Sequence, residues 1–274
     1  MMEMMELDRI ALREAAQRLY DQYSTVLSEA KLSSILSRSL DDGLLDFEST
    51  STARGIINDV VLRYYPNEAT IKAGFIDRVL VPQSPRTISI FELPIGKSRV
   101  DMCKVNGHSA AYEIKTDLDT FDRLEGQLRD YFDVFESVYV VTSERRWHEL
   151  PDYVPEGCGI YSYRQDPSDG TYHFQTRRKA AKCTDLDAEK QLRAIPKHGL
   201  CAIFNIKDTH MSKTAVIEAC LAESTPQKVN LAFKTYLKQR YGSHWKRFRE
   251  IEPSVLGIDY EWFYRNGLDP SIVY

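Results

Sequence analysis

The segment from residue 88 to residue 142 constrains the fold more than any other part of this sequence. Short runs of β-branched and apolar residues alternate there with turn signals, which predicts a series of strands. We expect these strands at 87–93, 99–105, 110–115 and 138–142. The last run, VYVVT, is continuous and apolar, as expected of a strand that is buried on both faces.

The connections between these runs predict how the strands pair. Asn106-Gly107 is a strong hairpin signal, so the second and third strands should be antiparallel neighbours. An apolar stripe at helical spacing separates the third strand from the fourth, at Leu118, Phe121, Leu124, Leu128, Phe132 and Phe135. A strand, a crossover helix and a strand imply parallel pairing of the two strands. We therefore predict an α/β fold with a mixed sheet.

Helical patterns dominate on both sides of this core. We expect helices within 5–40 and at 53–64, 68–80, 118–135, 186–195, 213–222 and 226–241, and two further strands at 157–163 and 172–177 that could extend the sheet. The predicted regions are an N-terminal helical region at 1–64, a core at 65–182 and a C-terminal helical region at 183–274.

The composition argues against several classes of protein. No stretch approaches the roughly 20 apolar residues that span a bilayer, and the acidic, amphipathic N-terminus does not resemble a secretion signal. The five cysteines are scattered, so neither a zinc knuckle nor a disulfide framework is expected. We expect a cytoplasmic protein that does not bind membranes.

Three residues of the central segment form a candidate catalytic group. Strand alternation places Glu113 and Lys115 on one face, and the hairpin brings Asp101 to the same face. Two carboxylates held together repel each other unless a cation lies between them, and oxygen ligands suit Mg²⁺ or Mn²⁺. A lysine beside them could activate a water or neutralise charge on a phosphate. The alternative is an ordinary surface ion pair across two strands.

The order SRVD, hairpin, YEIKTD, helix resembles the PD-(D/E)xK nuclease superfamily over roughly residues 65–145. Asp101 matches the first acid of its motif, and Glu113 and Lys115 match the (D/E)xK. Gln127 and Tyr131 match a Gln and a Tyr that members often carry in the following helix. The resemblance implies a restriction-endonuclease-like core of helix, meander, helix and strand, with Asp101 and Glu113 as metal ligands, Lys115 assisting the attacking water, and Gln127 orienting a ligand or phosphate.

The same resemblance implies a Mg²⁺- or Mn²⁺-dependent endonuclease that acts on DNA, in a phage, prophage or defence setting. A glutamate completes the metal site in many members, and Glu68 and Glu92 are equal candidates. Glu68 has another explanation, because an acid in the first turn of a helix complements the macrodipole. Val100 replaces the proline of the motif, which the superfamily tolerates.

Basic residues outside the motif are candidates for binding nucleic acid. Residues 225–249 carry seven Lys or Arg and no acid, interleaved with aromatics, although this run could equally be a solvated helix face and its aromatics could face the core. The residues expected to bind nucleic acid are Arg123, Tyr131, Arg177, Arg178, Lys238, Arg240, Lys246 and Arg247. Arg123 could instead pair with Asp119, and Asp117 or Asp119 is expected to cap the helix that follows.

Two other functions remain open at the level of sequence. The chain could be a nuclease-like module that binds nucleic acid without cutting it. It could also be an adaptor or inhibitor that binds a protein through its acidic N-terminal helices, since residues 1–60 carry eleven acids against six bases. A homodimer or another protein partner would be compatible with either alternative.

Overall fold

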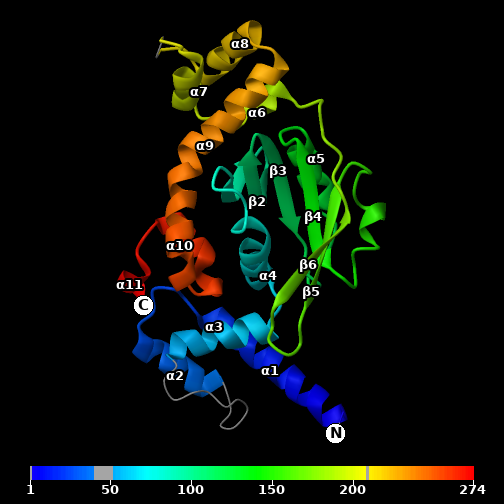
Figure 1. Ribbon diagram of the computed structural model, residues 1–274, viewed down its shortest axis with the longest axis vertical. Coiled ribbons are helices and arrows are strands. Elements are labelled where there is room, and N and C mark those ends of the chain that lie inside the picture. The colour runs from blue at the N-terminus through cyan, green and yellow to red at the C-terminus, as the bar shows by residue number, and fades with distance from the viewer. Residues whose placement is uncertain (1, 40–51, 208–209) are drawn as a thin grey trace. The chain divides into compact units, whose positions relative to one another are not determined.

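The computed structural model describes residues 2–39, 52–207 and 210–274 (Figure 1). The chain forms two compact units, each assembled from segments that are not consecutive. Unit 1 consists of 1–81, 164–173 and 247–274, and unit 2 consists of 82–163 and 174–246. Each unit thus groups segments that pack together rather than segments that are consecutive in the chain. The division into three consecutive regions stays a prediction.

A six-stranded mixed sheet forms the centre of the fold. Its strands are β1 (Ile88–Ile95), β2 (Ser98–Asn106), β3 (His108–Ile114), β4 (Ser137–Ser143), β5 (Gly159–Gln165) and β6 (Tyr172–Arg178), in that spatial order. The pairs β1–β2 and β2–β3 are antiparallel, whereas β3–β4 and β4–β5 are parallel. The predicted mixed α/β sheet is confirmed, including its hairpin, its parallel crossover and the two extending strands.

Two tight turns close the β1–β2–β3 meander. Gly107, with a φ of 68°, connects Asn106 to its partner His108. Gly96, with a φ of 60°, lies in the β1–β2 turn. Both backbones are left-handed, a conformation that glycine adopts without steric cost.

Helix α5 (Leu124–Phe132) lies against this meander and is shorter than predicted. The Ser98 hydroxyl donates to Asp130 Oδ2 over 2.7 Å, which fixes α5 to the β1–β2 turn. The predicted capping is wrong, because the residue before the helix is Arg123 and its side chain makes no capping bond. Asp119 instead accepts hydrogen bonds from Thr116, and Asp117 accepts one from Ser143.

Three tyrosines pack together on the face of the sheet opposite to Glu113. The rings of Tyr112 and Tyr139 are stacked with centroids 5.3 Å apart, and Tyr161 lies 5.3 Å from Tyr139. The Tyr139 ring packs closely against Gly159, its partner on the neighbouring strand. A Cβ atom at Gly159 would be 2.2 Å from the Tyr139 ring, so the close approach requires glycine.

The remaining helices of unit 2 come from the C-terminal half of the chain. They are α6 (Ala188–Ala194), α7 (Lys197–Phe204), α8 (Lys213–Glu223) and most of α9 (Pro226–Ile251). Helix α7 was not expected, and α9 runs ten residues beyond its predicted end. Within the described ranges, no helix is both long and apolar enough to cross a membrane.

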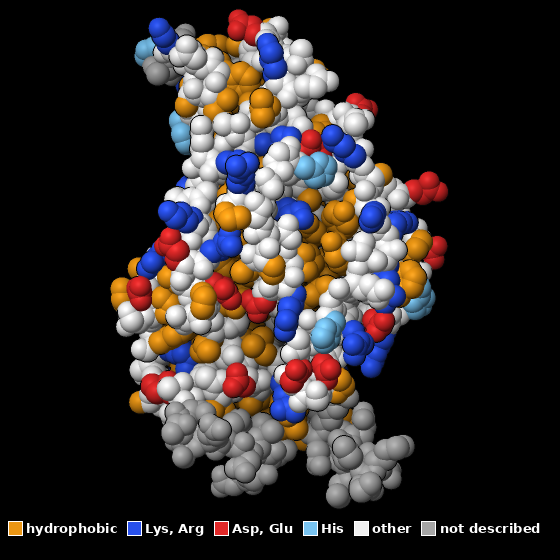
Figure 2. Space-filling model, viewed as in Figure 1, with side chains coloured by type: hydrophobic (Ala, Val, Ile, Leu, Met, Phe, Trp, Pro, Cys, Tyr) orange, Lys and Arg blue, Asp and Glu red, His pale blue; other side chains and the backbone are white. Residues whose placement is uncertain are grey.

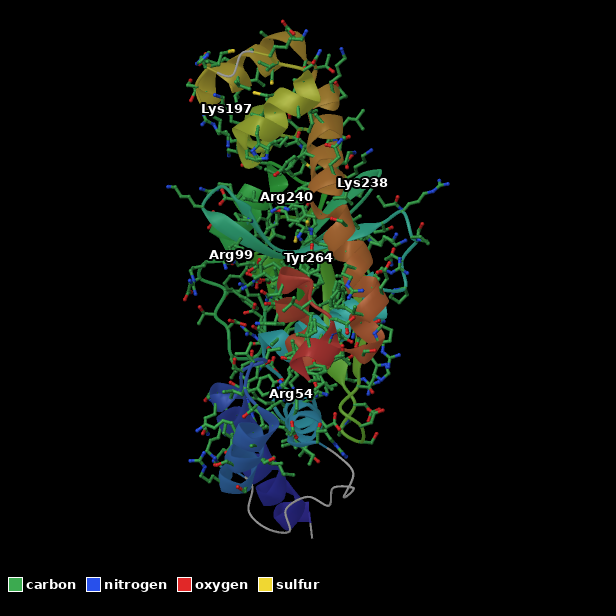
Figure 3. All side chains as sticks on the ribbon, turned by 90° about the vertical axis from the view of Figure 1, so that its left-hand side faces the viewer. Arg54, Arg99, Lys197, Lys238, Arg240 and Tyr264 are labelled. Atoms are coloured by element: carbon green, nitrogen blue, oxygen red, sulfur yellow. The ribbon has the colours of Figure 1, made fainter. Side chains whose placement is uncertain are left out.

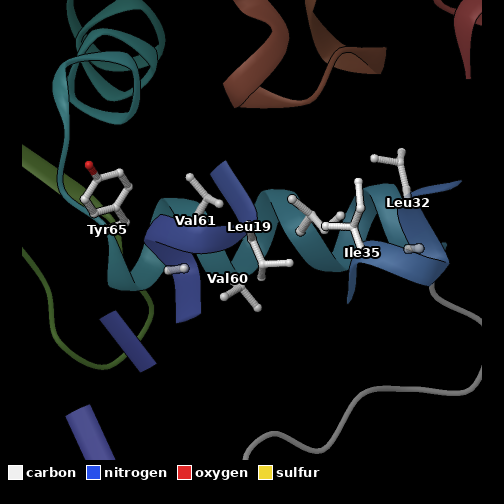
Figure 4. Packing of buried hydrophobic residues seen from close by; sticks show 9 residues of the cluster. Leu19, Leu32, Ile35, Val60, Val61 and Tyr65 are labelled. Carbon is white, nitrogen blue, oxygen red and sulfur yellow. The ribbon is translucent and has the colours of Figure 1, made fainter. Parts of the chain in front are cut away.

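Unit 1 is mainly helical. It contains α1 (Met2–Gln22), α2 (Glu29–Ser39), α3 (Ala53–Tyr64), α4 (Glu68–Phe75), α10 (Tyr260–Asn266) and α11 (Pro270–Val273). A π-helical segment, Ile76–Leu80, continues α4. Buried apolar residues of α1, α2 and α3 form one cluster, in which Leu19, Leu32 and Val61 are fully enclosed (Figure 4).

A buried polar network joins the two ends of the chain inside unit 1. Asp259 is fully buried and accepts hydrogen bonds from the hydroxyls of Tyr23, Thr25 and Tyr274 over 2.6–2.8 Å. Arg54 lies in the same network, because its guanidinium donates to the Tyr23 hydroxyl and to two backbone carbonyls of the α1–α2 connection. These contacts connect residues 23–27 and Arg54 with Asp259, and Asp259 with Tyr274, within unit 1.

Candidate active site

The site forms where β2 and β3 separate. The register of the hairpin ends at the pair Met102 and Tyr112, so Asp101 and Glu113 would form the next pair. Instead, the Asp101 carboxylate accepts the backbone N–H of Ile114 over 2.6 Å. The two acids therefore come from adjacent strands, as the sequence predicted, and they lie at the point where the ladder opens.

Glu113 is the centre of a closed hydrogen-bond network. Its side chain is only 2% exposed, and its Oε1 accepts from Lys115 Nζ over 2.8 Å. Gln127 Nε2 donates to the same oxygen over 2.5 Å, while Gln127 Oε1 accepts from Lys115 Nζ over 3.0 Å. Strand β3 supplies Glu113, Lys115 directly follows the end of β3, and α5 supplies Gln127, so the three predicted residues are in contact.

Tyr131, one turn further along α5, holds the other oxygen of Glu113. Its hydroxyl lies 2.8 Å from Glu113 Oε2 and 2.7 Å from the carbonyl oxygen of Arg99. Burial raises the pKa of Glu113, although Lys115, Tyr131 and Gln127 act against it. Burial and the nearby negative charges of Glu113 and Asp101 raise the pKa of Tyr131. Tyr131 was predicted to contact nucleic acid, but it is fully buried and contacts Glu113 instead.

Glu92 lies beside Asp101 in an unusual backbone conformation. Phe91 pairs with Met102 and Leu93 pairs with Val100, so the register places Glu92 opposite Asp101. Its φ is 56°, within a β-strand, where a non-glycine residue is strained by about 1–3 kcal/mol.

This conformation brings two carboxylates together on neighbouring strands. Glu92 and Asp101 each offer a carboxylate oxygen within 4.8 Å of the other, and Glu92 also pairs with Arg99 over 3.4 Å. Residues held in strained backbone conformations cluster at functional sites. The local sequence does not predict this strain, because glycine is the residue expected at a positive φ.

Glu68, the rival of Glu92, belongs to unit 1. Asn67 and Thr70 form a capping box at the start of α4, so Glu68 lies in the first turn of a helix, where an acid complements the macrodipole without a catalytic role. The Glu68 carboxylate pairs with Lys72 over 2.6 Å, and Lys72, which is 3% exposed, also pairs with Glu261 over 2.9 Å. Unit 1 therefore provides a cation for Glu68, and its assignment as a metal ligand stays a prediction.

The two arginines at the end of β6 already have partners within the protein. Arg177 donates to the Ser162 hydroxyl, pairs with Glu144 over 2.6 Å and stacks on Trp147. The Arg178 guanidinium donates to the carbonyls of residues 158 and 155. These contacts give both residues a structural role. We predicted from the sequence that they bind nucleic acid, and did not predict these contacts.

Three aromatic residues of the basic run point inward. Phe233, Trp245 and Phe248 are almost completely buried, as the core alternative predicted. Lys234 is also buried, where its amine donates to Glu136 over 3.0 Å and to the Gly107 carbonyl over 2.6 Å. Helix α9 is therefore fixed to the β2–β3 hairpin of unit 2.

Other basic residues of α9 lie nearer the surface. Arg240 and Lys246 are exposed and Lys238 is partly exposed, and Figure 3 labels Lys238 and Arg240. Arg247 pairs with Asp269 over 3.0 Å in unit 1. On the face shown in Figure 2, Lys and Arg side chains lie among acidic and neutral residues rather than in one continuous patch.

The family model described as bacteriophage P4 protein cII matches residues 63–256 of this chain. The chain belongs to this family. The matched range of the cII family contains Asp101, Glu113, Lys115, Gln127 and Glu92.

Protein cII of Enterobacteria phage P4 is 26% identical to the chain over 146 residues, which is 52% of this chain and 54% of that protein. The chain thus matches about half the length of this curated relative. Among solved structures, a protein of unknown function from Silicibacter pomeroyi aligns with 46% of this chain and 84% of its own, with a TM-score of 0.30 and 16% identity.

Proposed function

We propose that this cII-family chain is a metal-dependent nuclease that hydrolyses phosphodiester bonds of DNA, with a restriction-endonuclease-like core of PD-(D/E)xK type. One observation carries the proposal. Lys115 and Gln127 contact the Glu113 carboxylate, and Asp101 on the neighbouring strand accepts the backbone N–H of Ile114, the residue between Glu113 and Lys115. An acid from one strand and an acid and a lysine from the next are the groups that the motif requires.

The donor set fits a hard divalent cation such as Mg²⁺ or Mn²⁺. The carboxylates of Glu92 and Asp101 approach each other, which two anions do only at a cost unless a cation lies nearby. Glu113, which neighbours the residue bonded to Asp101, would supply a third carboxylate. A bound cation would polarise the scissile phosphate and lower the pKa of a coordinated water.

Lys115 would act on the attacking water or on the phosphate. An ammonium group has three N–H donors, and Glu113 and Gln127 accept from two of them. The third donor remains for a water or a phosphate oxygen. Gln127 holds the amine in place, because its carbonyl accepts from Lys115 while its amide donates to Glu113.

Exposed basic residues would bind the phosphate backbone of the substrate. Arg123, Arg240 and Lys246 are exposed, and Lys238 is partly exposed, so they are the better candidates among those predicted. The phage origin of the matched relative supports a phage or prophage setting for this activity. Action in the cytoplasm and a homodimer or protein partner remain part of the proposal.

The test is a cleavage assay on supercoiled plasmid, linear duplex and single-stranded DNA with Mg²⁺, Mn²⁺ or EDTA. We expect metal-dependent cleavage that Asp101→Asn and Lys115→Ala each reduce by at least about 100-fold, as for loss of a group that acts in the transition state. Appearance of nicked or linear plasmid identifies endonuclease action.

Two matched controls accompany these variants. Lys179→Ala removes an exposed lysine of the same unit, and Glu125→Gln changes an exposed acid of α5, so both should retain activity. DNA binding without cleavage by the wild type would identify a binding module instead. Neither binding nor cleavage would favour the adaptor or inhibitor. Cleavage that survives both Asp101→Asn and Lys115→Ala would refute the site.

A further inference from the structure

Side chains from another part of unit 2 hold the loop that follows Lys115. The backbone N–H of Lys115 donates to the Val141 carbonyl over 2.9 Å, which is the last bond from β3 to its neighbour β4. Beyond that point the chain leaves the sheet. Arg146 Nη1 then donates to the Thr116 carbonyl over 3.0 Å and to the Asp119 carbonyl over 2.8 Å.

Arg146 is itself firmly placed. Its backbone N–H bonds to the Ser143 carbonyl over 3.1 Å at the end of β4. The guanidinium carbon lies 4.1 Å from the centroid of the Phe121 ring, which is 6% exposed, and Nε lies 3.4 Å from Glu149. A planar guanidinium can stack on a ring and donate to two carbonyls at once, which a lysine amine on a flexible stem reproduces poorly.

The loop that Arg146 binds, at residues 116–123, is held together by hydrogen bonds between its own residues. Asp119 Oδ2 accepts the backbone N–H of Thr116 over 2.7 Å and its hydroxyl over 2.8 Å. The Leu118 N–H donates to the Thr116 hydroxyl over 3.1 Å, and Asp117 accepts from Ser143. The bonds among Thr116, Leu118 and Asp119 hold the loop together internally, and the bond from Ser143 connects it to β4. The two carbonyls that Arg146 binds therefore position the loop as a whole relative to β4.

We propose that Arg146 is a positioning residue for Lys115 in phosphodiester hydrolysis, an inference that rests on the proposed nuclease function. Arg146 holds Thr116, the residue after Lys115, while Val141 holds the Lys115 backbone from the other side. The Lys115 amine is thereby kept on Glu113 and Gln127, and its third donor keeps one direction. Arg146 acts through the loop and does not touch the reacting atoms.

The test compares steady-state kinetics of Arg146→Ala, Arg146→Lys and the wild type on whichever DNA the wild type cleaves. We expect kcat to fall on the order of 10- to 100-fold with KM changed less than about 3-fold, because a misplaced catalytic group slows chemistry rather than binding. Arg145→Ala is the matched control, since it removes an exposed arginine one residue away.

Chemical rescue separates positioning from general destabilisation. Free guanidinium at millimolar concentration should restore much of the activity of Arg146→Ala, whereas methylammonium should not, because the cavity left above Phe121 accepts a planar donor. Circular dichroism verifies that each variant is folded. If Arg146→Ala fails to fold, Arg146→Lys carries the test, since its stem retains part of the packing.

The outcomes separate this inference from the function it rests on. An inactive wild type refutes the proposed nuclease function, and this inference falls with it. An active wild type with unchanged kcat in folded Arg146→Lys and Arg146→Ala refutes the positioning role alone. A rise in KM without a fall in kcat also overturns it, because Arg146 would then bind substrate directly. Reduced kcat with rescue by guanidinium supports it.

Discussion

Replacing Glu92 by alanine and by glycine should reverse the usual order of stability of these two residues. Both substitutions remove the carboxylate and its contact with Arg99, so the two variants differ only in one Cβ atom. In an ordinary strand, glycine is less stable than alanine by about 0.5–1 kcal/mol. At a φ of 56°, the Cβ costs about 1–2 kcal/mol, which glycine avoids.

The balance of these terms makes Glu92→Gly more stable than Glu92→Ala by about 0.5–1 kcal/mol. Urea denaturation followed by tryptophan fluorescence measures the difference, and Trp245 reports on this region because it packs against Phe91 of β1. Thr176, an exposed residue of β6, provides the control position. There Thr176→Ala should be the more stable of the alanine and glycine variants.

The refuting result is an alanine variant at position 92 that is as stable as the glycine variant or more so. The backbone strain inferred from the left-handed conformation would then be absent. Under the proposed function, both variants also lose metal-dependent cleavage, since neither retains a carboxylate opposite Asp101. A Glu92→Gly variant that unfolds at higher urea than Glu92→Ala but is equally inactive fits a strained residue that supplies a carboxylate needed for cleavage.

Three further changes probe the rest of the fold. Burial raises the pKa of Asp77 from 3.8 to about 6. The protonated Asp77 side chain therefore contributes fully to the stability of unit 1 below about pH 4, and this contribution is lost as the pH rises through about 6. The loss is at most about 3 kcal/mol, and thermal melts of Asp77→Asn should lack this pH dependence. Gly159→Ala should destabilise unit 2 by about 2 kcal/mol or more in urea, because its methyl would overlap the Tyr139 ring, and a loss below about 0.5 kcal/mol would contradict the close approach. Asp259→Ala should destabilise unit 1 by about 3 kcal/mol, because three hydroxyls lose their acceptor and the buried Arg54 loses a nearby negative charge. If calorimetry gives a free energy of unfolding within about 1 kcal/mol of the wild-type value, Asp259 does not have this role.

Local patterns predicted the parts of the fold that local chemistry determines. The Asn106-Gly107 turn and the apolar run at 138–142 led to the hairpin and the parallel crossover, and both are present. The same alternation argument placed Glu113 and Lys115 together, and α5 delivered Gln127 to them. These features depend on residues near one another in the sequence.

The errors arise where distant contacts override a local pattern. Leu118 fitted the stripe of the helix predicted at 118–135, yet it is 58% exposed, because Arg146 and Asp119 hold residues 116–123 in a loop. The left-handed conformation of Glu92 likewise depends on its place opposite Asp101, which no property of the Glu92 neighbourhood indicates.

The buried network around Asp259 has a consequence for synthesis on the ribosome. The hydroxyls of Tyr23 and Thr25 emerge more than 200 residues before the carboxylate that accepts their hydrogen bonds. At about 5–20 residues per second, that interval lasts on the order of 10–50 seconds. During this interval the Arg54 guanidinium lacks the nearby Asp259 carboxylate. Helices α1, α2 and α3 therefore remain candidates for chaperone binding until translation reaches residue 259. The strands of the sheet, at residues 88–178, also emerge before residue 259, although the residues of α9 that pack on them follow up to residue 246.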